Sequence, residues 1–277
     1  MTSASRPKFP FALLGFWLRR ILPVWALIAL MIFLIQIAVC GIVHDNQGIK
    51  TLLNFLDLLP SFVKTALGGE ALQVGNVSAL IAIGYQHPLV LLLLMLFAVG
   101  VPTSLLTGEV EKGTMELILS RSITKTQVYV CAGALTVAGM FALVMVMFFG
   151  TFTATRIYHF EEPVSLYPFF RAAINGGLLA SAVGAIALLA ASVFRHRSMA
   201  VGVAVAYLVV NYFVAVIAEW WPRMGFLKPA TLFQYVNGPR IFREPAWPVG
   251  DMCVLAAILI GAAIAGGVIW HRRDLPL

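Results

Sequence analysis

The fold class of this chain is decided by the stretch Pro88-Leu-Val-Leu-Leu-Leu-Leu-Met-Leu-Phe-Ala-Val-Gly-Val-Pro-Thr-Ser-Leu-Leu106, which carries no charged residue. A transmembrane helix needs about 20 consecutive apolar residues to cross the hydrocarbon core of a bilayer. Five further segments of this kind follow the same pattern, so we expect six transmembrane helices at residues 21–43, 88–106, 128–151, 170–194, 199–217 and 252–270. The sequence therefore predicts an all-α polytopic membrane protein that forms a single domain over residues 1–277.

The composition of the whole chain agrees with this prediction. Of its 277 residues, 61% are hydrophobic and 11% are charged, whereas soluble domains carry about 45–50% and about 25%. Six crossings use roughly 120 residues, which leaves no room for a large folded domain outside the membrane. A soluble enzyme, a disulfide scaffold and a disordered chain are thereby excluded. The net charge of +7 suits anionic head groups, so we expect membrane lipids rather than nucleic acid as partners.

The positions of the basic residues indicate how the chain is oriented. Short basic clusters lie directly at the ends of spans, at Arg19-Arg20, Arg195-His196-Arg197 and His271-Arg272-Arg273. Basic residues next to span ends favour the cytoplasmic side of the membrane. We therefore expect a multi-pass protein with both termini in the cytoplasm.

Three segments outside the spans have a helical pattern. Phe9–Leu22 is apolar and aromatic with two arginines embedded, which predicts an amphipathic helix on the cytoplasmic surface. Ile49–Leu67 has leucines at helical spacing and predicts an external amphipathic helix. Phe226–Phe242 predicts short helices at the outer interface. The tryptophans near that last segment are expected to be interfacial anchors, namely Trp220, Trp221 and Trp247.

The sequence offers little for catalysis or metal binding. It has no Gly-Lys dipeptide for a phosphate-binding loop, and no His-Glu-x-x-His, Cys-x-x-Cys or Gly-x-Ser-x-Gly motif. The five histidines lie outside the spans or at their edges, so we expect no metal site. No acidic or basic residue falls in the middle of a span, whereas ion and proton relays usually need one. Two amides within spans, Asn175 and Asn211, either line a translocation path or bind a neighbouring helix.

The most informative segment connects the second and third spans: Gly108-Glu-Val-Glu-Lys-Gly-Thr-Met-Glu-Leu-Ile-Leu-Ser-Arg-Ser-Ile-Thr-Lys-Thr-Gln-Val-Tyr129. Connections between helices usually take about 2–8 residues, and this one is far longer. Gly113 and Thr114 break the chain and can cap a short helix from Met115 to Leu119. The segment predicts either a docking surface for a cytoplasmic partner or a solvated hairpin. We favour docking because three acids lie where the other inner loops are basic, at Glu109, Glu111 and Glu116.

The pattern Glu-x-Glu-x-Gly-Thr-x-Glu-Leu-x-Leu-Ser-Arg in this segment resembles the signature of ABC-2 type permeases, the membrane subunits of ATP-driven exporters. A proline commonly follows that arginine in the family, and this chain has Ser122 instead. The segment Leu227-Lys-Pro-Ala-Thr-Leu-Phe-Gln-Tyr235 is similar to the one that precedes the last span of these permeases. The signature is matched at Glu109, Glu111, Gly113, Thr114, Glu116, Leu117, Leu119, Ser120 and Arg121.

The resemblance implies a permease that pairs as a homodimer in the prokaryotic plasma membrane (the cell inner membrane) above two separate ABC ATPase subunits. Residues 109–126 would hold a coupling helix, and the turn at 195–198 would make a second, smaller contact. The chain would be no enzyme and bind no cofactor, because ATP and Mg would belong to the ATPase. The coupling residues implied are Glu109, Glu111, Lys112, Gly113, Thr114, Glu116, Ser120, Arg121, Arg195, His196 and Arg197.

Two other classes of function are weighed against this one. A secondary transporter or channel without an ATPase is disfavoured by the lack of charged residues in the middle of the spans. A membrane scaffold that anchors another assembly is compatible with every pattern above. An apolar path with a few amides and hydroxyls suits lipids, hydrophobic drugs or peptides equally, so the sequence names no substrate.

Overall fold

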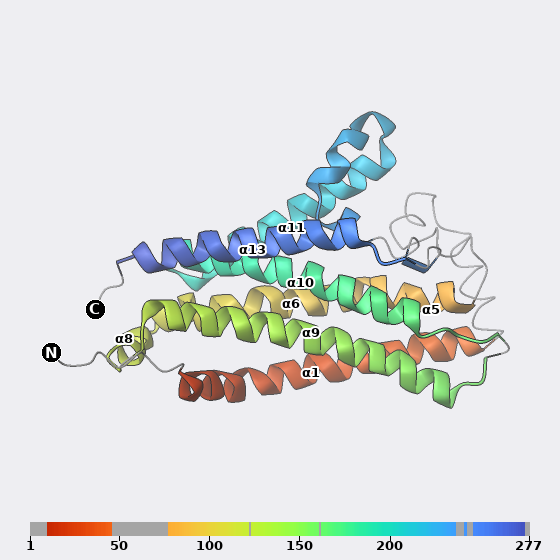
Figure 1. Ribbon diagram of the computed structural model, residues 1–277, viewed down its shortest axis with the longest axis horizontal. Coiled ribbons are helices and arrows are strands. Elements are labelled where there is room, and N and C mark those ends of the chain that lie inside the picture. The colour runs from red at the N-terminus through yellow and green to blue at the C-terminus, as the bar shows by residue number, and fades with distance from the viewer. Residues whose placement is uncertain are drawn as a thin grey trace.

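The computed structural model describes residues 10–45, 77–121, 123–160, 162–236, 241–242 and 246–274. Over these residues every regular element is a helix, and six helices are long and apolar enough to cross a membrane. Figure 1 shows them as a bundle with one common long axis. The chain is thus a multi-pass α-helical membrane protein, as the apolar segments predict.

The six long helices lie close to the predicted spans. They are α1 (Phe11–His44), α6 (Pro88–Leu105), α9 (Lys125–Ile157), α10 (Tyr167–Val193), α11 (Arg197–Trp220) and α13 (Val249–Arg272). The shorter elements are α5 (Val77–Gln86), α7 (Thr107–Glu111), α8 (Thr114–Leu119) and the 3-10 helices η1 (Pro222–Ala230) and η2 (Phe233–Tyr235). The sequence analysis missed α5, which precedes α6 with only His87 between them. The predicted external helix at 49–67 lies outside the described residues.

The expected surface helix before the first span is not a separate element. Phe11–Leu22 continues directly into the span, so α1 has 34 residues with Pro23 inside it. A proline removes one main-chain hydrogen bond, but a helix tolerates it where neighbouring helices pack around it. Close by, Trp25 Nε1 donates to the main-chain oxygen of Gly139 on α9 at 3.0 Å. The helical pattern is confirmed, whereas the predicted boundary near Leu22 is wrong.

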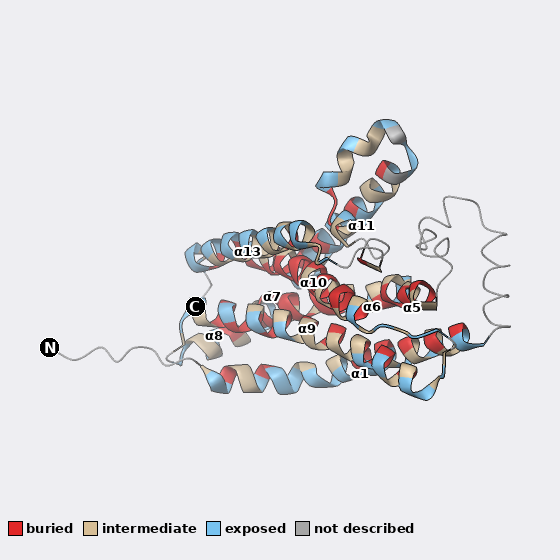
Figure 2. Ribbon diagram, turned by 45° about the vertical axis from the view of Figure 1, so that its right-hand side comes forward, coloured by how far each residue is buried: buried red, intermediate tan, exposed pale blue. Residues whose placement is uncertain are grey.

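Helix α10 is the centre of the bundle. It packs against α13, α9, α6 and α11. In its most apolar stretch 72% of the residues are buried, compared with 17% in α11 and 11% in α13 (Figure 2). Small residues let the neighbouring helices approach closely. A Cβ on Gly177 would lie 3.0 Å from Val144 Cγ2, and one on Gly184 would lie 2.8 Å from Thr136 Cγ2. Contacts this close tie α10 firmly to α9.

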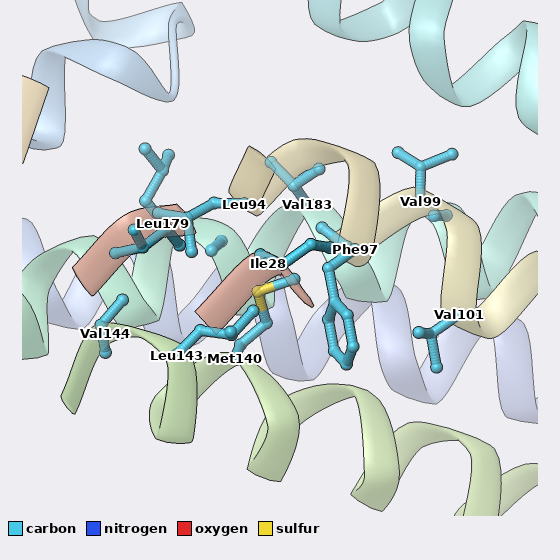
Figure 3. Close-up of a cluster of buried hydrophobic side chains, with 14 of the residues drawn as sticks. Ile28, Leu94, Phe97, Val99, Val101, Met140, Leu143, Val144, Leu179 and Val183 are labelled. Atoms are coloured by element: carbon cyan, nitrogen blue, oxygen red, sulfur yellow. The ribbon is translucent and has the colours of Figure 1, made fainter. Parts of the chain in front are cut away.

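A buried apolar cluster fills the space between α1, α6, α9 and α10 (Figure 3). Within a membrane the lipid is as apolar as this cluster, so the helices are held by close packing rather than by exclusion of water. The ring of Phe97 occupies the room above Gly139, where a Cβ would lie 2.7 Å from two ring carbons. The labelled members of the cluster are Ile28, Leu94, Phe97, Val99, Val101, Met140, Leu143, Val144, Leu179 and Val183.

The two ends of the bundle carry different elements. One end, here called the α8 end, holds α7, α8, the start of α1 and the end of α13 (Figure 1). The other, here called the α5 end, holds α5 and the start of α10. Helix α11 and η1 lean away from the bundle in both ribbon views. With six crossings, the start of α1 and the end of α13 lie on the same side, but which side faces the cytoplasm stays a prediction.

Candidate functional site

The segment between α6 and α9 folds into two short helices at the α8 end. Helix α7 follows α6 after Leu106 and ends at Glu111. Gly113 then takes a φ of 72°, in the left-handed region that glycine adopts without steric cost. This turn lets α8 begin at Thr114. The predicted short helix is therefore confirmed, together with the break at Gly113 that precedes it.

The side chain of Glu109 points into the protein. It is 3% exposed, and its carboxylate accepts hydrogen bonds from Arg20 Nη1 on α1 and from the hydroxyl of Thr114. The same hydroxyl lies 3.2 Å from the main-chain oxygen of Glu109. Hydrogen bonds in which one group is ionised are about twice as strong as neutral ones. Glu109 thus fastens α7 to α1 and to the start of α8.

Glu111 joins the two segments that the sequence analysis assigned to separate contacts. Its Oε2 accepts the main-chain N–H of Arg197, the first residue of α11, at 3.1 Å. Its Oε1 lies 3.7 Å from Nδ1 of His196. The first N–H groups of a helix have no partner within the helix, and a carboxylate there also interacts favourably with the helix dipole. The 107–121 segment and the turn between α10 and α11 therefore form one surface.

The outer side of α8 is exposed. Leu117 is 68% exposed, whereas Met115 is buried against the bundle. The hydroxyl of Ser120 donates to the main-chain oxygen of Leu117 at 2.9 Å and closes the end of α8. We define the α8 face as eight of the exposed residues of these two segments: Lys112, Glu116, Leu117, Ser120, Arg121, Arg195, His196 and Arg197.

The end of α13 reaches the same surface, which the sequence analysis did not foresee. Arg273 Nη1 lies 3.3, 3.1 and 3.0 Å from the main-chain oxygens of Ala191, Ser192 and Phe194, at the end of α10. Burial, with a smaller contribution from Arg195, lowers the pKa of Arg273. A cation at this position interacts favourably with the last carbonyl groups of a helix. Arg273 therefore caps α10 immediately before the turn of the α8 face.

Two arginines of this site, Arg20 and Arg273, were used only as signs of orientation in the sequence analysis. For Arg273 the signal that could have marked it is its position directly after a helix, where it can reach carbonyl groups that need a donor, whereas Arg20 lies inside α1 and carries no such signal. Their partners could not be named, since Arg20 and Glu109 lie 89 residues apart in the chain. Such pairs follow from the packing of the helices and not from any local pattern.

Asn175 and Asn211 are buried and bind the main chain near η2. Asn175 Nδ2 donates to the oxygen of Tyr235 at 2.9 Å, and Asn211 Oδ1 accepts the N–H of Leu232 at 2.9 Å. Arg171 acts in a similar way, since it donates to the main-chain oxygens of Ala246 and, at 2.6 Å, of Ile241. Both asparagines thus hold the main chain of residues 232–235 against the bundle, and their role in lining a path stays a prediction.

The fold and the α8 face define the class of this protein: a six-helix membrane protein with an ordered surface of short helices at one end. Comparison of the chain with protein-family models and with curated proteins finds no match. Within the part of the chain that the structure describes, no group of three or more His, Cys, Asp and Glu side chains could hold a metal ion.

Proposed function

We propose that this chain is the permease subunit of an ATP-driven exporter of the ABC-2 type, which works as a homodimer with a separate ATPase subunit. The observation that carries the proposal is the hydrogen bond from Arg197 N–H to Glu111. It unites the two segments expected at the ATPase in one exposed surface. In this proposal the α8 end lies in the cytoplasm of a prokaryotic cell, and the chain binds no nucleotide of its own.

The α8 face has the chemistry of a docking surface. It carries an exposed apolar side chain, Leu117, in the same short segment as two exposed charged residues, Glu116 and Arg121. Interfaces are commonly organised this way, because a buried apolar anchor supplies affinity while surrounding polar groups exclude water and set the orientation. A short helix of this kind fits a cleft on a partner protein.

Hydrogen bonds behind the α8 face connect it to the long helices of the bundle, so movement of this surface can be transmitted to them. Movement of α8 would act on α1 through Thr114, Glu109 and Arg20. Movement of α7 would act on α11 through Glu111. Small shifts at such contacts are transmitted because packed helices move as rigid elements. An ATPase that closes on ATP would therefore move α1 and α11 relative to the rest of the bundle.

The test is reconstitution of the chain with a separately expressed ABC ATPase subunit, followed by measurement of ATP hydrolysis and substrate efflux in vesicles. Leu117→Ala and Glu116→Ala should each raise the ATPase concentration that gives half-maximal stimulation about tenfold, as expected for loss of roughly 1.4 kcal/mol of interface energy. The matched control is Glu162→Ala, an exposed glutamate at the α5 end, which should stay within about twofold of wild type.

Two results would contradict the proposal. Efflux that proceeds at full rate without ATP or an ATPase would identify a secondary transporter or channel. A stable assembly that shows neither efflux nor stimulation with any ATPase subunit tested would identify a scaffold.

A further inference from the structure

The last turn of α10 depends on a residue from the far end of the chain. The final carbonyl groups of a helix have no donor within the helix. Three carbonyls at this end, those of Ala191, Ser192 and Phe194, all face Nη1 of Arg273 at 3.0 to 3.3 Å. One guanidinium therefore serves the end of the helix that leads directly into Arg195 and His196 of the α8 face.

The same place also receives α7. The hydroxyl of Thr107, the first residue of α7, donates to the oxygen of Ala191 at 3.2 Å, so this single carbonyl accepts from both Thr107 and Arg273. The start of α7, the end of α10 and the end of α13 thus converge on one atom. Any displacement of Arg273 changes the surroundings of both segments that make up the α8 face.

Arg273 is itself held in place by α9 and α13. Lys125 Nζ donates to its main-chain oxygen at 2.9 Å, and its guanidinium lies 5.7 Å from the centre of the Trp270 ring. Trp270 is buried and donates from Nε1 to the main-chain oxygen of Lys125 at 3.0 Å. A side chain fixed in this way loses little entropy when it makes further contacts, and it holds its neighbours in one geometry.

From this convergence we propose that Arg273 is a positioning residue for the docking of the ATPase. It holds the turn between α10 and α11 in the geometry in which Arg195 and His196 meet the partner, without touching the partner itself. The end of α13 is then a third component of the coupling apparatus. The docking part of this inference rests on the proposed function, whereas the ordering of the turn rests on the contacts above.

The test compares Arg273→Gln and Arg273→Lys with Arg272→Gln, an exposed neighbour that loses the same charge. The first measurement is amide hydrogen exchange of residues 194–197 in the purified chain. We expect exchange about tenfold faster in Arg273→Gln, a smaller increase in Arg273→Lys, and a change within about twofold in Arg272→Gln. Lysine falls between because an ammonium group keeps the charge but lacks the planar guanidinium that lies against the Trp270 ring.

The second measurement titrates the reconstituted permease with its ATPase subunit. Arg273→Gln should raise the half-saturating ATPase concentration about tenfold while the maximal stimulated rate stays near wild type, because the turn is misplaced rather than lost. A structural defect alone would lower the maximal rate instead. If Arg273→Gln fails to insert in the membrane, amide exchange and the ATPase titration are both measured on Arg273→Lys.

Each outcome is distinguishable from failure of the proposed function. Unchanged exchange at residues 194–197 in Arg273→Gln would overturn the positioning role whatever the partner. Faster exchange with an unchanged half-saturating concentration would overturn the docking role. A wild-type chain that does not bind the ATPase would refute the proposed function and the docking role together, and the exchange measurement would still test the ordering of the turn.

Discussion

The carboxylate of Glu109 connects three helices through Arg20 on α1 and Thr114 on α8. The side chain of Glu109 is 4% exposed and that of Arg20 is 34% exposed. Water can therefore solvate the charge of Arg20 in part when its partner is lost. We expect Glu109→Gln to lower the free energy of unfolding by about 1–3 kcal/mol, below the range for fully buried pairs. Chemical unfolding in detergent measures this change.

A double-mutant cycle provides the control for this prediction. If the pair interacts directly, Arg20→Gln combined with Glu109→Gln should cost clearly less than the sum of the two single changes. Strictly additive costs would show that the two side chains act independently and that the contact is of no consequence for stability.

Gln36 is a second polar residue inside the bundle, at the contact of α1 with α5 and α9. Neither atom of its amide has a hydrogen-bond partner among the described residues, and a Cβ on Gly84 would lie 2.6 Å from its Oε1. Because a buried amide without partners costs about 1–3 kcal/mol, Gln36→Met should raise the free energy of unfolding by about that amount. A thermal unfolding series measures it, and a loss of stability would reveal a partner for the amide.

At the scale of elements, α13 touches the bundle closely at Gly266. A Cβ there would lie 3.0 Å from Leu189 Cα and 2.5 Å from the hydroxyl of Tyr129, whereas a Cβ on Gly261 would meet nothing within 4 Å. Gly266→Ala should therefore lower the free energy of unfolding by about 1–3 kcal/mol through overpacking.

The same helix supplies the matched control, Gly261→Ala, which should leave stability unchanged or slightly higher because alanine favours the helix. Unfolding of both variants in the same detergent gives the comparison. Equal stability of the two variants would mean that α13 shifts freely and that its contact with α10 is not tight.

Elements whose ends depend on local chemistry were predictable from the sequence. Gly113 marked the break before α8, and the uninterrupted apolar residues marked the six spans. The continuity of Phe9–Leu22 with the first span was not predictable, because α1 passes through Pro23 where packing against α9 supports it. The site was predictable only as two segments. Two hydrogen-bonded contacts join these segments: Glu111 accepts from Arg197 N–H, and Arg273 donates to the end of α10. Each contact connects residues that lie about 80 positions apart or more in the chain.

For the whole molecule, orientation is the property to test. Single cysteines at Ser120 and His196 mark the α8 end, and one at His159 marks the α5 end. In a chain whose native cysteines are replaced, an impermeant reagent added to sealed right-side-out vesicles should label only position 159, since basic residues next to span ends favour the cytoplasmic side. Labelling of positions 120 and 196 instead would show that the protein has the opposite orientation. As a control, all three positions should react once the vesicles are opened.

The length of α1 has a consequence for the surrounding bilayer. Its exposed apolar side chains run from Phe11 to Ile42, a height of about 47 Å at 1.5 Å per residue, whereas those of α13 run from Val249 to Ile269, about 30 Å. The hydrocarbon core is about 30 Å thick, and fitting α1 into it would take a tilt of about 50°, beyond the usual limit of about 40°. We therefore expect the first turns of α1, with Phe11 and Phe16, to lie in the head-group layer, where lipid head groups would cover these rings.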